Sequence, residues 1–459
     1  MTRVSEENEP RTESHDPKVP AAWQAFMRTG WGDRELDLPR HPVADLAAQR
    51  RSRLAAAFPG ERLVLPAGTW KVRSNDTDYR FRPDTAHTYF SGNQTSDAVL
   101  VIDSDATGAG ESVLYARPRS SRDTDEFFRD RQYGELWAGR RPSTHELATS
   151  LGIEVRHIDD LPDPDGRKTR DAATDDELDR VASEMRLAKD QWEIEQLQEA
   201  CDITALGFED AVAEWDRVLE FGERWIEGTF FRRARAMGND IGYDSIVGGG
   251  KHATTLHWTD NTGPITPGEL VLLDMGVEAR SLYTADVTRT LPVDGTFTAL
   301  QRELYDLVHA AQQAGISAVR PGAPFLAAHD AAMDVLAHGL EGLDLLPVSA
   351  QEALDPDSKV YARWTLHGTS HMLGLDVHDC GRASDEAYRN GTLEEGYVLT
   401  VEPGLYFQED DLLVPEELRG IGIRIEDDIL VTADGSHNLS ASLPRTSADV
   451  EEWMGRRRG

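Results

Sequence analysis

The first part of the chain alternates short apolar runs with helical stretches. Apolar runs occupy residues 63–65, 98–102, 112–115 and 153–155, and an Arg-rich helical stretch precedes them. Short apolar runs separated by helical spacing are typical of strands that alternate with helices. We therefore expect a small α/β domain over residues 46–183.

The second part of the chain carries longer helical patterns. Asp190 and Glu193 form a helix start signal, which apolar residues at helical spacing follow as far as Phe208. Thr298 and Gln301 begin a second such pattern, which ends before the Pro-Gly pair at 321–322. Strand-like segments lie between these helices. This pattern predicts a larger domain over residues 184–459.

Residues 1–45 are rich in Glu, Asp, Pro and Arg and show little periodicity. This composition predicts an acidic, partly disordered N-terminal tail, in which residues 21–27 could form a short helix. The N-terminal residues lack the apolar stretch of a secretory signal peptide. We therefore expect cytoplasmic residence.

Composition narrows the function classes. The 459 residues are 39% hydrophobic, which fits a soluble enzyme with two sizeable cores, and no segment approaches the length of a membrane span. The net charge of −34 argues against binding to nucleic acid or anionic membranes. The two cysteines, Cys201 and Cys380, cannot form a disulfide framework for a chain of this size, and we expect both to be reduced.

Five residues of metal-ligand type stand in distinctive local sequences. They are Asp274 after the apolar run 270–273, Asp286 in Thr-Ala-Asp-Val-Thr, His371 in His-Gly-Thr-Ser-His, Glu402 in Glu-Pro-Gly, and Glu426 in Arg-Ile-Glu-Asp-Asp. Four carboxylates and one imidazole form a mostly hard, oxygen-rich set, and carboxylates can bridge two divalent ions about 3.5 Å apart. We therefore predict two divalent ions. Mn²⁺ is favoured, whereas Co²⁺, Fe²⁺ and Zn²⁺ stay open.

From about residue 46 onwards, these motifs resemble the pita-bread metallopeptidases, and within them the Xaa-Pro aminopeptidases (aminopeptidase P). The resemblance implies an α/β (α+β) architecture in which a pita-bread catalytic domain follows a smaller α/β domain. It also implies that Asp274 binds one metal ion, that Asp286 and Glu426 bridge both, and that His371 and Glu402 complete the second.

The resemblance further implies catalytic and substrate-binding residues. These are His257, His367, His378, Glu402 and Arg424. In the family, the histidines contact the substrate and handle protons, the carboxylate at the position of Glu402 receives a proton from the nucleophilic water, and Arg424 and Tyr406 support the centre. The expected substrates are peptides with N-terminal Xaa-Pro, and the expected assembly is a homodimer or homotetramer.

One spacing departs from the family pattern. The interval between Asp274 and Asp286 is one residue longer than usual, and we expect a hairpin loop around residues 279–282 to absorb the insertion.

The nearest functional alternative is a prolidase, which cleaves only Xaa-Pro dipeptides with nearly the same metal ligands. A methionine aminopeptidase is disfavoured by the extra N-terminal domain, and a creatinase-like enzyme by the complete set of metal ligands. The remotest alternative is a non-catalytic peptide-binding module.

Overall fold

The computed structural model describes residues 19–163 and 165–457, which form two compact units divided between Asp179 and Arg180. The division falls inside helix α7 (Asp176–Glu184), as does the boundary expected at residues 183/184. No helix of the described residues is long and apolar enough to cross a membrane.

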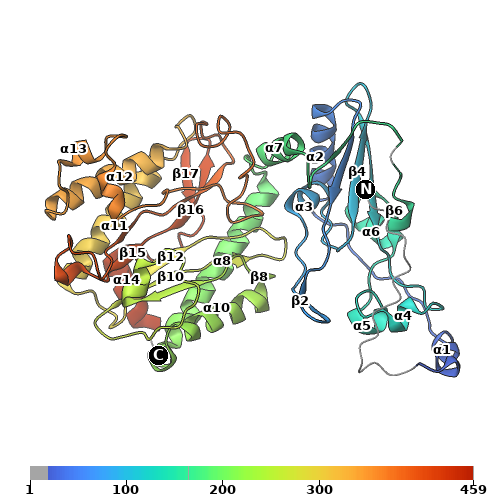
Figure 1. The fold of residues 1–459 in the computed structure, drawn as a ribbon, viewed down its shortest axis with the longest axis horizontal. Helices are drawn as coiled ribbons and strands as arrows, with labels where there is room; N and C mark the ends of the chain where they lie inside the picture. Colours follow the sequence, from blue (N-terminus) through green and yellow to red (C-terminus); the bar gives the residue numbers. More distant parts are fainter. Residues whose placement is uncertain (1–18, 164, 458–459) are drawn as a thin grey trace. The chain divides into compact units, whose positions relative to one another are not determined.

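The first unit is built on a five-stranded sheet with the order β6-β5-β4-β1-β7 (Figure 1). Its strands are β1 (Arg62–Pro66), β4 (Val99–Ser104), β5 (Gly110–Ala116), β6 (Glu154–His157) and β7 (Thr169–Asp171). The β1–β4 and β4–β5 pairs are antiparallel, whereas β1–β7 and β5–β6 are parallel. The four apolar runs between residues 63 and 155 thus form strands as predicted.

Helices and a hairpin complete this unit. They are α1 (Ala21–Met27), α2 (Ala44–Ala57), α3 (Thr85–Ser91), α4 (Glu126–Arg129), α5 (Glu135–Ala138), α6 (Thr144–Leu151) and the hairpin β2 (Val72–Ser74) and β3 (Thr77–Asp78). The short helix expected at residues 21–27 is present, and Trp23 packs edge-on against Phe128 at 5.2 Å between ring centroids. Residues 1–18 of the predicted tail lie outside the described residues, and α2 begins at Ala44, just before the expected end of the tail at residue 45.

The second unit contains two three-stranded sheets, β12-β10-β9 and β13-β16-β17, and shorter strand pairs. Its strands are β8 (Asp240–Ile241), β9 (Ile246–Gly249), β10 (Leu270–Asp274), β11 (Val277–Glu278), β12 (Thr288–Pro292), β13 (Val398–Val401), β14 (Gly404–Tyr406), β15 (Gly422–Arg424), β16 (Asp427–Thr432) and β17 (Gly435–Asn438). Strands β10, β12 and β15 lie between α8 and α10 on one side and α11 on the other (Figure 1).

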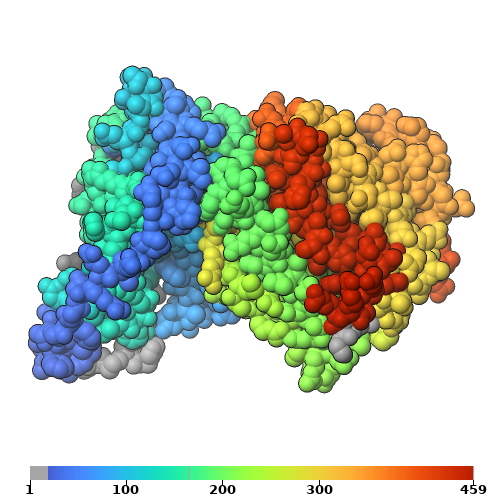
Figure 2. Space-filling model, turned by 180° about the vertical axis from the view of Figure 1, so that it is seen from behind, coloured from blue at the N-terminus to red at the C-terminus, as the bar shows by residue number. Residues whose placement is uncertain are grey.

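The helices of this unit cover the sheets and enclose its main core. They are α8 (Gln191–Ala213), α9 (Trp215–Phe221), α10 (Glu223–Met237), α11 (Ala299–Ala318), α12 (Ala327–Gly342), α13 (Ala350–Ala353) and α14 (Ser447–Arg457). Asp190 and Thr298 close capping boxes at the starts of α8 and α11, as the sequence predicted. Figure 2 shows the C-terminal segment, in red, between the green and yellow segments, and α14 contacts both α8 and α11.

A tight hairpin lies around residues 279–282, where a loop was expected. Glu278 and Thr284 form an antiparallel bridge, and the Leu282 amide donates to the Ala279 carbonyl. Leu282 has φ +73°, a left-handed conformation that is uncommon for a bulky residue. The loop lies between Asp274, which ends β10, and Asp286, which stands two residues before β12.

Candidate active site

All nine predicted site residues line one cavity of about 560 Å³ in the second unit. They are His257, Asp274, Asp286, His367, His371, His378, Glu402, Arg424 and Glu426. Apolar groups of Ile246, Leu256 and Val377 complete part of the wall. A mostly apolar pocket with a few convergent polar groups is the usual form of a small-ligand site.

The strand arrangement explains why residues distant in the sequence meet here. Asp274 ends β10, and its register partner on the neighbouring strand is Thr288, two residues after Asp286. Glu402 directly follows β13, and Glu426 lies between β15 and β16. The segment of His371 lies beside β13, since the Thr400 amide donates to the His371 carbonyl.

Three of the five predicted metal ligands lie close enough to share one ion. Ligand atoms of Asp286, His371 and Glu426 are all within 4.8 Å of one another. His371 Nε2 also lies 3.6 Å from Glu402 Oε1. Asp274 joins the group through Tyr243, whose hydroxyl lies 2.6 Å from Asp274 Oδ1 and 2.5 Å from Asp286 Oδ1.

Among the described residues, the buried carboxylates of this cluster outnumber the cationic groups that contact them. Asp274, Asp286 and Glu426 are each less than a tenth exposed, and Arg424 is the guanidinium that pairs with Asp274, at 2.6 Å. Burial raises the pKa of Glu426 well above its usual value, and the Asp286 carboxylate raises it further. Buried carboxylates in excess of cations need protons or metal ions to balance them. The donor set therefore fits divalent ions.

The pKa values of Asp274, Glu402 and His371 are also raised, which favours the protonated forms of these groups when no metal ion is bound. Burial raises the pKa of Asp274 and Glu402, against the opposing effects of Arg424 and His371. Burial lowers the pKa of His371, but a hydrogen bond to Asp286 and the nearby Glu402 carboxylate outweigh it and raise the pKa to about 9. Because metal ligands must be deprotonated, binding of a divalent ion here would release protons.

A hydrogen-bonded chain connects Asp274, through Arg424 and Tyr406, to His367. Arg424 donates from one terminal nitrogen to the Tyr406 hydroxyl at 2.8 Å, and that hydroxyl lies 2.8 Å from His367 Nε2. His367 Nδ1 lies 2.8 Å from the Gly368 carbonyl, which makes Nδ1 the protonated nitrogen of a neutral ring. Burial lowers the pKa of His367 to about 4, and Arg424 lowers it as well.

The other two predicted histidines lie at the exposed rim of the cavity. His257 and His378 are both exposed, and the His378 ring lies edge-on to His371 at 4.3 Å between centroids. Burial and the neighbouring His371 lower the pKa of His378. Both rings are therefore accessible to a ligand in the cavity.

Cys380 lies near the centre in the sequence but does not line the cavity. Burial raises the pKa of its thiol to about 12, and the Asp379 carboxylate adds to the effect. Cys201 is buried in the core, and both cysteines are free, as predicted. Cys380 is therefore a buried thiol that lies outside the residues lining the cavity.

Sequence reasoning missed three polar residues of the centre. Tyr243 bridges two carboxylates, Thr288 donates to Glu426 Oε2 at 2.6 Å, and Thr400 contacts Glu402 Oε1 at 3.3 Å. Thr288 and Thr400 each stand two residues from a predicted ligand, so strand alternation would have placed them on the same face. Tyr243 had no such signal, because it comes from a separate segment.

A cavity lined by five carboxylates and several histidines, with His371 close to Asp286 and Glu426, is typical of metal-dependent hydrolases. The family model of metallopeptidase family M24 matches residues 195–433, and the model of the aminopeptidase P N-terminal domain matches residues 47–167. The chain therefore belongs to metallopeptidase family M24. The expected architecture, a pita-bread catalytic domain after a smaller α/β domain, is confirmed.

Relatives match over almost the whole chain. Xaa-Pro aminopeptidase 2 of Streptomyces coelicolor is 50% identical over 466 residues, which cover 97% of this chain and 98% of the relative. Xaa-Pro aminopeptidase 1 of the same organism is 52% identical, covering 94% and 92%. Among solved structures, zinc-substituted Escherichia coli aminopeptidase P in complex with product has a TM-score of 0.79 and 30% identity, covering 93% of this chain and all of that one.

Proposed function

We propose that this chain is a manganese-dependent Xaa-Pro aminopeptidase that releases the N-terminal residue from peptides with proline in position two. The observation that carries the proposal is the convergence of all nine predicted site residues on one cavity. Its relatives named Xaa-Pro aminopeptidase support the substrate class.

Asp274, Asp286, His371, Glu402 and Glu426 would hold two divalent ions. Bound ions would supply Lewis acidity, which makes a water nucleophilic near neutral pH and polarises a carbonyl oxygen. The oxygen-rich donor set favours Mn²⁺. Mn²⁺ occupancy is tested by metal analysis of protein purified without added metal.

The remaining groups would bind and orient the peptide. Cleavage before proline breaks a bond whose nitrogen carries no hydrogen, so the enzyme must recognise ring shape. The neutral ring of His367, next to Tyr406 and apolar wall groups, suits a pyrrolidine ring. Glu402 would accept the proton of the attacking water at its carboxylate, and His257 and His378 at the rim would contact the peptide carbonyls.

The test compares peptides of different length and sequence. Protein stripped of metal and then reloaded with Mn²⁺ is incubated with Ala-Pro, Ala-Pro-Ala and a longer Xaa-Pro peptide, and products are identified by mass spectrometry. Metal-dependent loss of one N-terminal residue from the longer peptides is expected, with Ala-Ala-Ala as the matched control for proline. Cleavage of the dipeptide alone would identify a prolidase, and no cleavage with any divalent metal would favour the binding module.

The assembly and the location are further predictions. A homodimer or homotetramer is expected and is measured by sedimentation equilibrium. Cytoplasmic residence is expected and is measured by cell fractionation.

A further inference from the structure

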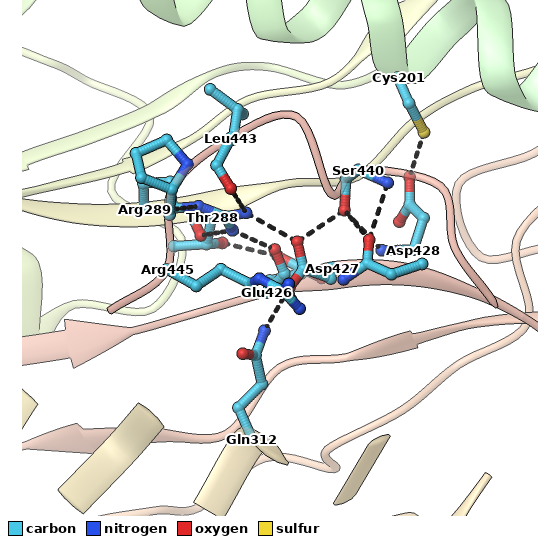
Figure 3. Close-up of polar contacts among 12 residues, drawn as sticks. Cys201, Thr288, Arg289, Gln312, Glu426, Asp427, Asp428, Ser440, Leu443 and Arg445 are labelled. Carbon is cyan, nitrogen blue, oxygen red and sulfur yellow. Dashed lines mark hydrogen bonds and ion pairs between the residues drawn. The ribbon is translucent and has the colours of Figure 1, made fainter. Parts of the chain in front are cut away.

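Arg289 lies behind the carboxylate cluster with its side chain 1% exposed. Its guanidinium donates to four backbone carbonyls and one carboxylate. The acceptors are Pro444 O at 2.7 Å, Thr288 O at 2.9 Å, Glu426 O at 2.6 Å, Leu443 O at 3.4 Å and Asp427 Oδ1 at 2.7 Å. One rigid fork thus holds three separate segments of the chain together (Figure 3).

Its partner Asp427 is fully buried and contacts further side chains, among them Arg445, whose Nη1 lies 3.6 Å from Oδ2. The Ser440 hydroxyl donates to Asp427 Oδ1 at 2.6 Å, and the Gln312 amide donates from α11 to Oδ2 at 2.8 Å. Figure 3 shows these groups converging on the carboxylate from different sides. The pair is therefore a hub that fixes strand β16 to β12, to the turn at 440–445 and to helix α11.

The hub lies directly behind the two carboxylates expected to bridge the metal ions. Arg289 is three residues after Asp286, and Asp427 directly follows Glu426. Successive residues of an extended segment point to opposite faces. Glu426 accordingly faces the cavity, where it accepts from Thr288, while neither Arg289 nor Asp427 lines the cavity.

The two segments are also joined by direct backbone contacts. The Glu426 amide donates to the Thr288 carbonyl at 3.1 Å, and the Asp286 amide donates to Asp428 Oδ2 at 3.0 Å. Arg289 binds the carbonyl oxygens of both Thr288 and Glu426. Its position therefore constrains the separation between the Asp286 and Glu426 segments.

We propose that the buried Arg289–Asp427 pair is a positioning device that sets the spacing of Asp286 and Glu426, and through it the affinity of the paired metal ions. The inference rests on the proposed function, because it assumes that both carboxylates bind metal. Neither residue of the pair touches substrate or metal. Groups that orient metal ligands from behind affect metal affinity and activity by about 10- to 100-fold.

The test uses Asp427→Asn, which keeps the size of the side chain and removes its charge. Mn²⁺ dissociation constants are measured by isothermal titration calorimetry, and electron paramagnetic resonance reports whether two bound ions are spin-coupled. We expect the dissociation constant of the weaker ion to rise about 10- to 100-fold and the coupled signal to weaken. The turnover number should fall, while KM for the peptide at saturating Mn²⁺ stays within about twofold.

Two controls separate positioning from loss of stability. Asp210→Asn breaks an Arg–Asp pair away from the centre, the bidentate pair between Arg233 on α10 and Asp210 on α8, and Leu336→Ala opens the core without touching the centre. Both should keep the metal affinity of the parent protein. If Asp427→Asn does not fold, Ser440→Ala removes one donor to Asp427 and should weaken Mn²⁺ binding less, in the same direction.

Unchanged dissociation constants and an unchanged coupled signal in folded Asp427→Asn or Ser440→Ala would overturn the inference. Failure of the proposed function looks different: the parent protein would bind two Mn²⁺ ions and leave every Xaa-Pro peptide intact. In that case the Mn²⁺ dissociation constants of the variants still show whether the Arg289–Asp427 pair positions Asp286 and Glu426.

Discussion

Arg424 donates to Asp274 Oδ2 across 2.6 Å, and the two side chains are buried together at the wall of the cavity. The same guanidinium donates to the Tyr406 hydroxyl at 2.8 Å and the Thr288 hydroxyl at 3.1 Å. It therefore links Asp274, a predicted metal ligand, to the Tyr406 hydroxyl that contacts His367. A lysine ammonium group, which is a compact charge on a flexible side chain, cannot donate to all three acceptors in this geometry.

We predict that Arg424→Lys lowers kcat/KM for Ala-Pro-Ala by about 10- to 100-fold, because buried acceptors lose their donors. Steady-state kinetics at saturating Mn²⁺ measures the loss. Arg363→Lys is the matched control, since Arg363 also makes a bidentate pair, with Asp411, in the same unit. An Arg424→Lys enzyme as active as this control would contradict a role for the guanidinium fork.

The Tyr406 hydroxyl lies between Arg424 and His367, and its removal leaves both without that partner. We predict that Tyr406→Phe lowers kcat/KM roughly tenfold, with unchanged Mn²⁺ content. In combination with His367→Gln the losses should be non-additive, because both changes break one chain. Tyr305→Phe, which removes a buried hydroxyl that donates to the Arg445 carbonyl, should have no such coupling.

Much of the centre could be predicted because its ligands occupy short, distinctive motifs. The strand that ends at Asp274 and the strand just before Glu402 are mostly apolar, and helices α8 and α11 begin with capping boxes at Asp190 and Thr298. These signals are local, so sequence alone reveals them. The extra residue before Asp286 could likewise be assigned to a hairpin loop, because a turn tolerates an insertion that a paired strand does not.

What sequence could not predict depends on contacts between distant segments. Tyr243 reaches Asp274 and Asp286 across 31 and 43 residues, and Arg289 reaches Asp427 across 138. Residues 426–428 are three consecutive acidic residues with no sequence signal that separates their roles. In the structure, Glu426 faces the cavity and Asp427 faces Arg289. Only the register between β12 and the 424–428 segment distinguishes them.

In the first unit, His87 is fully buried, with Nδ1 2.8 Å from the Leu65 carbonyl and Nε2 3.1 Å from the Asn93 amide. Burial lowers the pKa of His87 from 6.5 to about 4. The unfolded chain therefore takes up a proton before the folded unit does. The stabilisation by neutral His87 is complete above pH 6.5 and is lost progressively as the pH falls towards 4.

We predict that this loss reaches about 3 kcal/mol at about pH 4. Hydrogen-exchange mass spectrometry of peptides covering residues 63–93 measures it locally, apart from any acid effect on the metal centre. In His87→Gln, which carries no titrating ring, this part of the pH dependence should disappear. A pH dependence identical in both proteins would show that another group is responsible.

Asp379 is a buried carboxylate next to His378, and it is held by two buried cations of the same unit. Its Oδ1 accepts from Arg186 Nε at 3.0 Å and from the Cys380 amide at 2.8 Å, and Lys189 Nζ lies 3.8 Å from Oδ2. Arg186 lowers the pKa of Asp379 despite its burial, so the group is ionised. Removing one member of such a group leaves an uncompensated buried charge.

We predict that Asp379→Asn destabilises the protein by about 3–5 kcal/mol, because Arg186 and Lys189 then share no carboxylate. Chemical unfolding measures this loss. Arg180→Gln, which breaks the partly exposed pair with Glu184, should cost less than about 1 kcal/mol. Because Asp379 anchors the backbone beside His378, turnover of folded Asp379→Asn should also fall, with Mn²⁺ affinity unchanged. A loss of stability with full turnover would mean that the ion group supports the fold and leaves the position of His378 unaffected.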